Sequence, residues 1–107
     1  MRRSLHTHPP FANAIALAFG CIPAVYNEAR AALKKEKTVL TIDTTALEEG
    51  GEDPTAIASG LENSEILMVK GHGLFVASNG IDTCLYLSTV VEINAKIYSV
   101  MKGMSAD

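Results

Sequence analysis

The sequence has little of what disulfide-rich, membrane-spanning or nucleic-acid-binding proteins need. Its 107 residues hold two cysteines, Cys21 and Cys84, too few and too unpatterned for a disulfide framework or a thiolate zinc site. No apolar run reaches the roughly 20 residues of a membrane-spanning helix, and no basic-then-apolar leader opens the chain. The net charge is −3 and the basic residues are scattered, which argues against nucleic acid as a main partner. We therefore expect a cytoplasmic protein that binds neither nucleic acid nor a membrane.

What is present is typical of one globular domain over 1–107. Hydrophobic residues make up 48% of the chain and charged residues 20%, a balance that disordered chains lack. Segments of strand character alternate with segments of helical periodicity. Strands are expected at 2–8, 38–43, 65–71 and 74–78, and helices at 10–19, 27–35, 53–63 and 81–102. This interleaving predicts a layered α/β fold. The acidic stretch 46–54 is expected to be an exposed loop, with Asp53 capping the helix that follows.

Two of these helices carry specific expectations. The helix at 10–19 starts at a double proline, is broadly apolar and ends at Gly20, so we expect it to be largely buried. Its large apolar residues are Phe11, Ile15, Leu17 and Phe19. The helix at 81–102 has a polar stripe in which Glu92 and Lys96 are spaced for an i,i+4 ion pair, and Gly103 is expected just beyond its end.

The three histidines stand in two short motifs at predicted strand ends. His6 and His8 are two apart in a strand, so their side chains share one side, roughly 7 Å apart at Cα. His72 lies between two glycines after an apolar strand. Imidazole suits zinc, and a catalytic zinc site typically has three protein ligands and one open position. Either motif alone is more often incidental than a ligand set, but together they favour a shared metal site.

The flanks of these histidines resemble a known family. The segments SLHTHPPFANAIALAFGCIPAV and ILMVKGHGLFVASNGIDTCLYLSTVVEINAKIY are similar to the C-terminal part of the class II aldolase/adducin family, in its fuculose-1-phosphate aldolase branch. The resemblance implies a mixed sheet with flanking helices and a Zn²⁺ or similar divalent ion held by His6, His8 and His72. It also implies an aldehyde-lyase of carbohydrate metabolism, which cleaves a short sugar phosphate by metal stabilisation of an enediolate.

The same resemblance implies parts that this chain does not show. In the family, an acid/base carboxylate and phosphate-binding loops precede the H-x-H motif, and no acidic residue here matches the catalytic position. The tyrosine that the family supplies from a neighbouring subunit would fall near Tyr26-Asn27. The register puts Asn27 and not Tyr26 at that place, so the catalytic residues stay unassigned and Tyr26 is a candidate only as the neighbour of that position. We expect an N-terminally shortened domain, inactive or weak alone, in a homo-oligomer or with a separate chain supplying the missing half. A fragment of a longer aldolase, an intact small metal-binding protein and a non-catalytic adducin-like structural domain are the alternatives.

Overall fold

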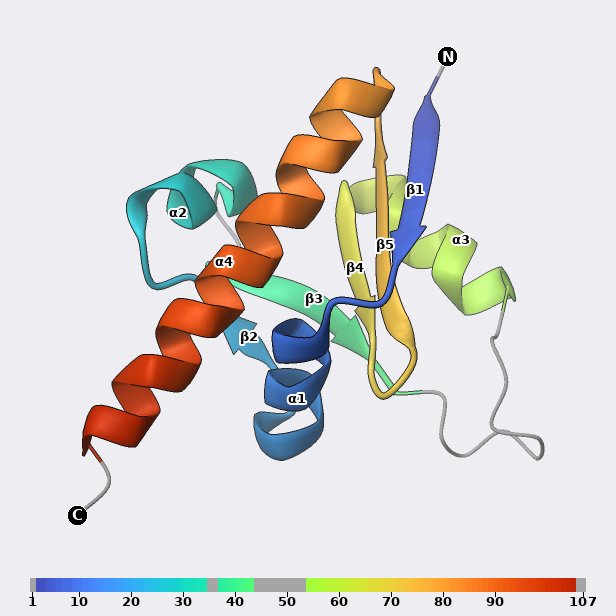
Figure 1. Cartoon of the computed structure of the whole chain (residues 1–107). Coiled ribbons are helices and arrows are strands. Elements are labelled where there is room, and N and C mark those ends of the chain that lie inside the picture. The colour runs from blue at the N-terminus through green and yellow to red at the C-terminus, as the bar shows by residue number, and fades with distance from the viewer. Residues whose placement is uncertain (1, 35–36, 44–53, 106–107) are drawn as a thin grey trace.

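Strands and helices alternate along the chain in the computed structural model, which describes residues 2–34, 37–43 and 54–105 (Figure 1). The expected loop at 46–54 and the expected cap Asp53 lie outside these residues, apart from Pro54. The strands are β1 (Arg3–Thr7), β2 (Ile22–Pro23), β3 (Thr38–Ile42), β4 (Ile66–Val69) and β5 (Gly73–Ser78). The helices are α1 (Pro10–Phe19), α2 (Asn27–Leu33), α3 (Pro54–Asn63) and α4 (Ile81–Ser105). Each strand and helix expected from the sequence is present, and the short β2 was not expected.

The five strands form one mixed sheet in the order β1-β5-β4-β3-β2. Neighbours are antiparallel except β3 and β4, which are parallel and are joined through a connection that contains α3. In the β1–β5 ladder His6 lies opposite Phe75, and Thr7 lies opposite Leu74. This register brings the end of β1 to the turn between β4 and β5.

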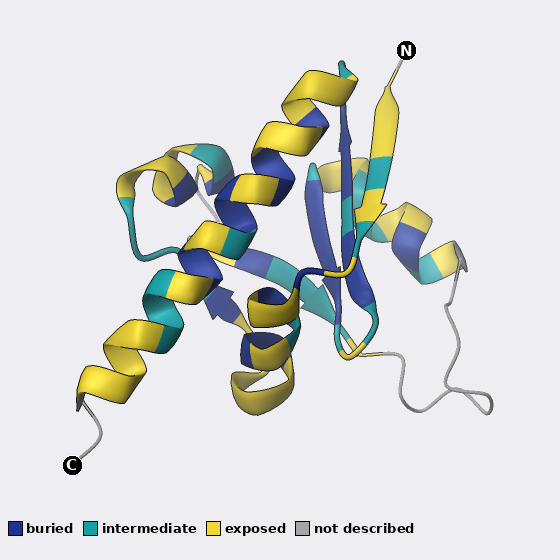
Figure 2. Ribbon diagram, viewed as in Figure 1, coloured by how far each residue is buried: buried dark blue, intermediate teal, exposed yellow. Residues whose placement is uncertain are grey.

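Helices cover both faces of the sheet, so the predicted layered α/β class is confirmed. Figure 1 shows α4, α1 and α2 on one face and α3 on the other. All of β4 and all residues of β5 except the half-buried Phe75 are buried between these layers (Figure 2). The larger core cluster joins α1, α2 and α4 to the sheet, and the smaller one joins Ile57 of α3 to Leu67 and Val69 of β4. Burial of these apolar side chains is the main favourable term that holds the layers together.

The prediction that α1 is largely buried is wrong for three of its four large apolar residues. Ile15 is buried together with Ala12 and Ala16, a stripe at i, i+3 and i+4 that packs on the core. Phe11, Leu17 and Phe19 are 39%, 54% and 50% exposed. The buried stripe consists of Ile15 and two small residues, so the other three large apolar residues lie on the exposed part of the helix, which Figure 2 colours yellow.

The expected ends and pairings of α4 also differ from the structure. The helix continues to Ser105, so Gly103 lies inside it and not beyond its end. A Cβ at Gly103 would meet nothing within 4 Å and its φ is not positive, so neither packing nor backbone conformation requires glycine at that residue. Glu92 accepts hydrogen bonds from the backbone N–H groups of Phe11 and Ala12, at 3.0 and 2.9 Å. Pro9 offers no side-chain cap to α1, so the Glu92 carboxylate caps that helix instead of forming the expected ion pair with Lys96.

The structure also gives the state of the two thiols and the apolar character of the helices. Cys21 is exposed, Cys84 is buried, and both are free. Within the described part of the chain, no helix combines the length and the apolar character that a bilayer crossing requires.

Candidate metal centre

Strand pairing brings the three histidines together from two distant parts of the sequence. His6 is in β1, His8 directly follows that strand, and His72 is in the turn between β4 and β5. Because β1 runs antiparallel to β5, the end of β1 lies beside the residues that start β5. Ligand-capable ring nitrogens of the three side chains lie within 4.8 Å of one another. The structure therefore unites all three histidines that the sequence singled out.

The rings have a definite mutual geometry. The Nε2 atoms of His6 and His8 are 3.1 Å apart. The ring centroids of His6 and His72 are 5.1 Å apart with the planes 7° from parallel, whereas the His8 ring stands at 89° to both. His6 and His8 are exposed and His72 is half-buried, so the group lies at the surface with one side backed by the protein.

Backbone and ring contacts from β5 orient His6. Its Nδ1 atom lies 3.0 Å from the carbonyl oxygen of Leu74. A carbonyl oxygen only accepts, so Nδ1 carries the proton and Nε2 of the neutral ring keeps its lone pair toward His8. The ring of Phe75 stacks on the same imidazole, with centroids 3.9 Å apart and planes 16° from parallel. A partner that fixes the tautomer and plane of a histidine is the usual support of a metal ligand.

The turn that carries His72 is tied to the neighbouring strand. Gly71 has φ +75°, a conformation that glycine adopts without steric cost. The N–H of His72 donates to the carbonyl of Val69 at 2.9 Å, and the N–H of Lys70 donates to the carbonyl of Ile42 at 2.8 Å. Lys70 also lies 3.7 Å from a carboxylate oxygen of Asp43. These contacts hold the turn against the end of β3.

The donor set fits a first-row divalent ion such as Zn²⁺. Zn–N bonds of 2.0–2.1 Å in tetrahedral geometry place ligand nitrogens about 3.3 Å apart. The 3.1 Å between His6 and His8 is already close to that spacing, and the remaining nitrogens lie within 4.8 Å. Within the described residues the group consists of imidazoles alone. Three neutral nitrogen donors are the composition of a catalytic zinc site with one open position.

Tyr26, the catalytic candidate from sequence, lies elsewhere in the molecule. It precedes α2 and follows β2, which is at the opposite edge of the sheet from β1. Its hydroxyl donates to the carbonyl of Val90 in α4 at 3.5 Å. Burial raises the pKa of Tyr26 above its ordinary value of 10.0, and Glu28 and Tyr86 raise it further. Within one chain, Tyr26 therefore belongs to the α2–α4 contact.

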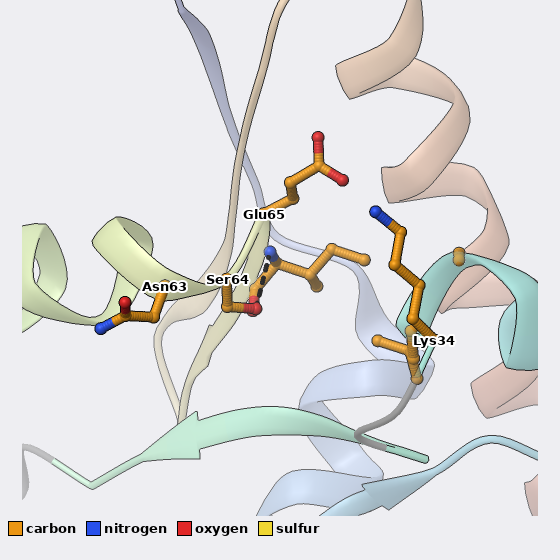
Figure 3. Close-up of a pocket in the computed structure, with 7 residues that line it drawn as sticks. Lys34, Asn63, Ser64 and Glu65 are labelled. Atoms are coloured by element: carbon orange, nitrogen blue, oxygen red, sulfur yellow. Dashed lines mark hydrogen bonds between the residues drawn. The ribbon is translucent and has the colours of Figure 1, made fainter.

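One hollow lies apart from the imidazole group and another borders it at His8. One of about 290 Å³ opens between the end of α2 and the start of β4, where Ser64 bonds to the backbone of Ile66 (Figure 3). Its polar lining is Lys34, Asn63, Ser64 and Glu65. The other, of about 400 Å³, runs between the β1–α1 connection and α4 and includes His8, Thr89 and Lys96 in its lining. The H-x-H motif reaches the second hollow through His8, whereas no sequence motif pointed to the first.

Comparison with known proteins agrees with this fold. The family model described as Class II Aldolase and Adducin N-terminal domain matches residues 2–99. A search of curated proteins found no significant match.

Solved structures share the architecture at low identity. An L-fuculose-1-phosphate aldolase from Thermus thermophilus is 20% identical with a TM-score of 0.77, over 97% of this chain and 55% of that one. A second L-fuculose 1-phosphate aldolase is 22% identical with a TM-score of 0.75, over 96% of this chain and 47% of its own. The chain thus spans about half the length of these relatives. Since the family model covers nearly the whole sequence, the chain belongs to the class II aldolase and adducin family.

Proposed function

We propose that this chain is a metal-dependent, aldolase-type lyase domain of carbohydrate metabolism. In this proposal His6, His8 and His72 hold Zn²⁺ or a similar divalent ion, and the substrate is a short sugar phosphate of the fuculose-1-phosphate type. The observation that carries it is the convergence of three imidazoles within 4.8 Å, in a chain of this family. A domain with a purely structural role has no need of such convergence.

The chain's own residues supply the ligands and their orientation. A bound ion supplies a Lewis acid, which stabilises the negative charge that develops on the oxygens of a hydroxyketone during carbon–carbon cleavage. The three imidazoles carry no negative charge when neutral, so they would not reduce the positive charge of a bound ion. Leu74 and Phe75 keep the His6 ring in one orientation, which limits the reorganisation needed when substrate arrives.

Proton transfer and phosphate binding are proposed to come from groups outside this set. The imidazole group includes no carboxylate among the described residues. Tyr26 is proposed to reach the centre of a neighbouring subunit, because within its own chain it lies by α4. The acid/base carboxylate and the phosphate site are proposed to come from the part of the family fold beyond this chain.

Exposed apolar surface supports an assembly of more than one chain. Large apolar side chains lie open on α1 and along α4, and β1 forms an edge of the described sheet. They are Phe11, Leu17 and Phe19 on α1, and Ile81, Leu85, Tyr86, Ile93, Val100, Met101 and Met104 on α4. Exposed apolar patches of this kind commonly mark sites of protein–protein contact. We propose a homo-oligomer, or a complex with a separate chain that carries the other half of the fold. Light scattering that shows a monomer at high concentration would contradict both.

The free thiols are consistent with the cytoplasm as the proposed location.

A non-catalytic role is the second candidate. The chain spans about half of its solved relatives, and among the described residues the imidazole group includes no carboxylate. A metal-binding or adducin-like interaction domain would keep the histidines without turning over a sugar phosphate.

Retro-aldol assays separate the two functions. The purified chain, loaded with Zn²⁺ or treated with chelator, would be incubated with fuculose-1-phosphate and related ketose phosphates, with His72→Ala as control. We expect little or no turnover from this chain alone, and any cleavage should require zinc and His72. Weak cleavage that requires zinc and His72 supports the lyase, and metal binding with no cleavage even when the other half of the fold is supplied as a separate chain favours the second candidate. Fast zinc-dependent cleavage would show that the proton donor and phosphate site are already present.

A further inference from the structure

We propose that Gly73 is a positioning residue of the imidazole group, and that together with Phe75 it holds His6 and His8 where they share a ligand. This inference rests on the proposed metal site and adds a role for two residues of β5. The sequence pattern singled out Gly73 only as a flank of His72. The structure gives it contacts with the other two histidines.

The space at Gly73 is already taken by β1 and its histidines. A Cβ at this residue would lie 2.6 Å from the carbonyl oxygen of Thr7. It would also lie 2.7 Å from Cε1 of His6 and 2.7 Å from Cδ2 of His8. Real Cβ atoms essentially never approach other atoms closer than 3.0 Å. Because the nearest of the three is backbone, β1 itself would have to move, and both imidazoles would move with it.

The requirement at Gly73 is for space and not for an unusual backbone conformation. The glycines with positive φ in the described residues are Gly20 and Gly71, so an alanine could adopt the backbone angles of Gly73. On the other side of His72, a Cβ at Gly71 would meet only the end of the Leu17 side chain, at 3.3 Å. Gly80 has open space around it and no positive φ, which makes it a matched control.

Phe75 completes the support from the same strand. It lies directly opposite His6 in the β1–β5 register and stacks on that imidazole. The residue between Gly73 and Phe75 is Leu74, whose carbonyl oxygen accepts a hydrogen bond from the Nδ1–H of His6. Three consecutive residues of β5 thus give the His6 ring a close approach, a hydrogen bond and a flat surface. Such supporting contacts typically change metal affinity by about 10–100-fold when removed.

The test compares Gly73→Ala, Phe75→Leu and Phe75→Tyr with Gly80→Ala and wild type. Three measurements are made on each: thermal unfolding in EDTA, zinc affinity by calorimetric titration, and the protonated ring nitrogen of His6 by ¹⁵N NMR without metal. We expect Gly73→Ala to weaken zinc binding at least about tenfold and to lose the single Nδ1–H form of His6. Phe75→Leu should weaken binding severalfold, whereas Phe75→Tyr and Gly80→Ala should match wild type.

Two results would overturn the inference: a folded Gly73→Ala chain with wild-type zinc affinity, or a Phe75→Leu chain with wild-type zinc affinity. If Gly73→Ala does not fold, the Phe75→Leu and Phe75→Tyr pair decides, because both leave the strand backbone intact. Failure of the proposed metal site can be distinguished from failure of the positioning role. If wild type binds no zinc, the proposed function fails, and the NMR state of His6 in the variants still tests the positioning role.

Discussion

Replacing Glu92 with alanine should destabilise the protein by removing the cap of a helix that lies far from it in sequence. The carboxylate accepts from Phe11 N at 3.0 Å and from Ala12 N at 2.9 Å, at the start of α1. A helix N-cap is worth about 0.5–2 kcal/mol, and a hydrogen bond to a charged group about 1.5–3 kcal/mol. Because Glu92 is only half-buried, water replaces part of what is lost. We therefore expect a loss near 2 kcal/mol, or about 8 °C in the unfolding midpoint.

Urea unfolding followed by circular dichroism, in EDTA so that metal does not contribute, measures this loss. Glu92→Gln keeps one acceptor without the charge and should lose about half as much. Lys96→Ala is the control, since Lys96 lies 5.5 Å over the Phe11 ring and should cost only about 0.5 kcal/mol. Equal losses of stability for Glu92→Ala and Lys96→Ala would support the Glu92–Lys96 ion pair that the spacing predicts, and would refute the capping role.

Two further perturbations test the packing of α4 and α2. Asn94 is 1% exposed; its side chain accepts a hydrogen bond from the N–H of Val25 and donates one to the carbonyl of Pro23, both at 2.8 Å. Asn94→Ala should therefore lower the free energy of unfolding in urea by about 3 kcal/mol. A loss below about 1 kcal/mol would contradict these buried hydrogen bonds. Tyr26 has a raised folded pKa, so the stability it contributes is fully present below the unfolded value of 10.0 and is lost as the pH rises through the folded value. Tyr26→Phe should therefore lose less stability than wild type between pH 8 and pH 11 in thermal unfolding, and parallel pH curves would argue against burial of the hydroxyl.

The strands, the helices and the three histidines of the cluster could be predicted because their signals are local. Alternation placed His6 and His8 on one side of a strand, and the glycines around His72 marked a turn. The pairing of β1 with β5 then unites them, as the family resemblance implied.

What could not be predicted depends on contacts between distant residues. The exposure of Phe11, Leu17 and Phe19 follows from how α1 meets α4, which an apolar composition does not specify. Glu92 has a suitable i+4 partner in sequence, but its carboxylate bonds to the otherwise unsatisfied N–H groups at the start of α1. β2 is too short to show a period. The close approach at Gly73 is invisible until β1 lies beside it.

Zinc content in the purified protein tests the central claim most directly. Elemental analysis after dialysis against a trace of Zn²⁺ should find about one ion per chain, removable by chelator and restored on readdition. His6→Ala, His8→Ala and His72→Ala should each lower that content sharply, while Cys21→Ala, a potential ligand outside the group, should leave it unchanged. Full zinc content in all three histidine variants, or no zinc in the wild-type chain, would contradict the account.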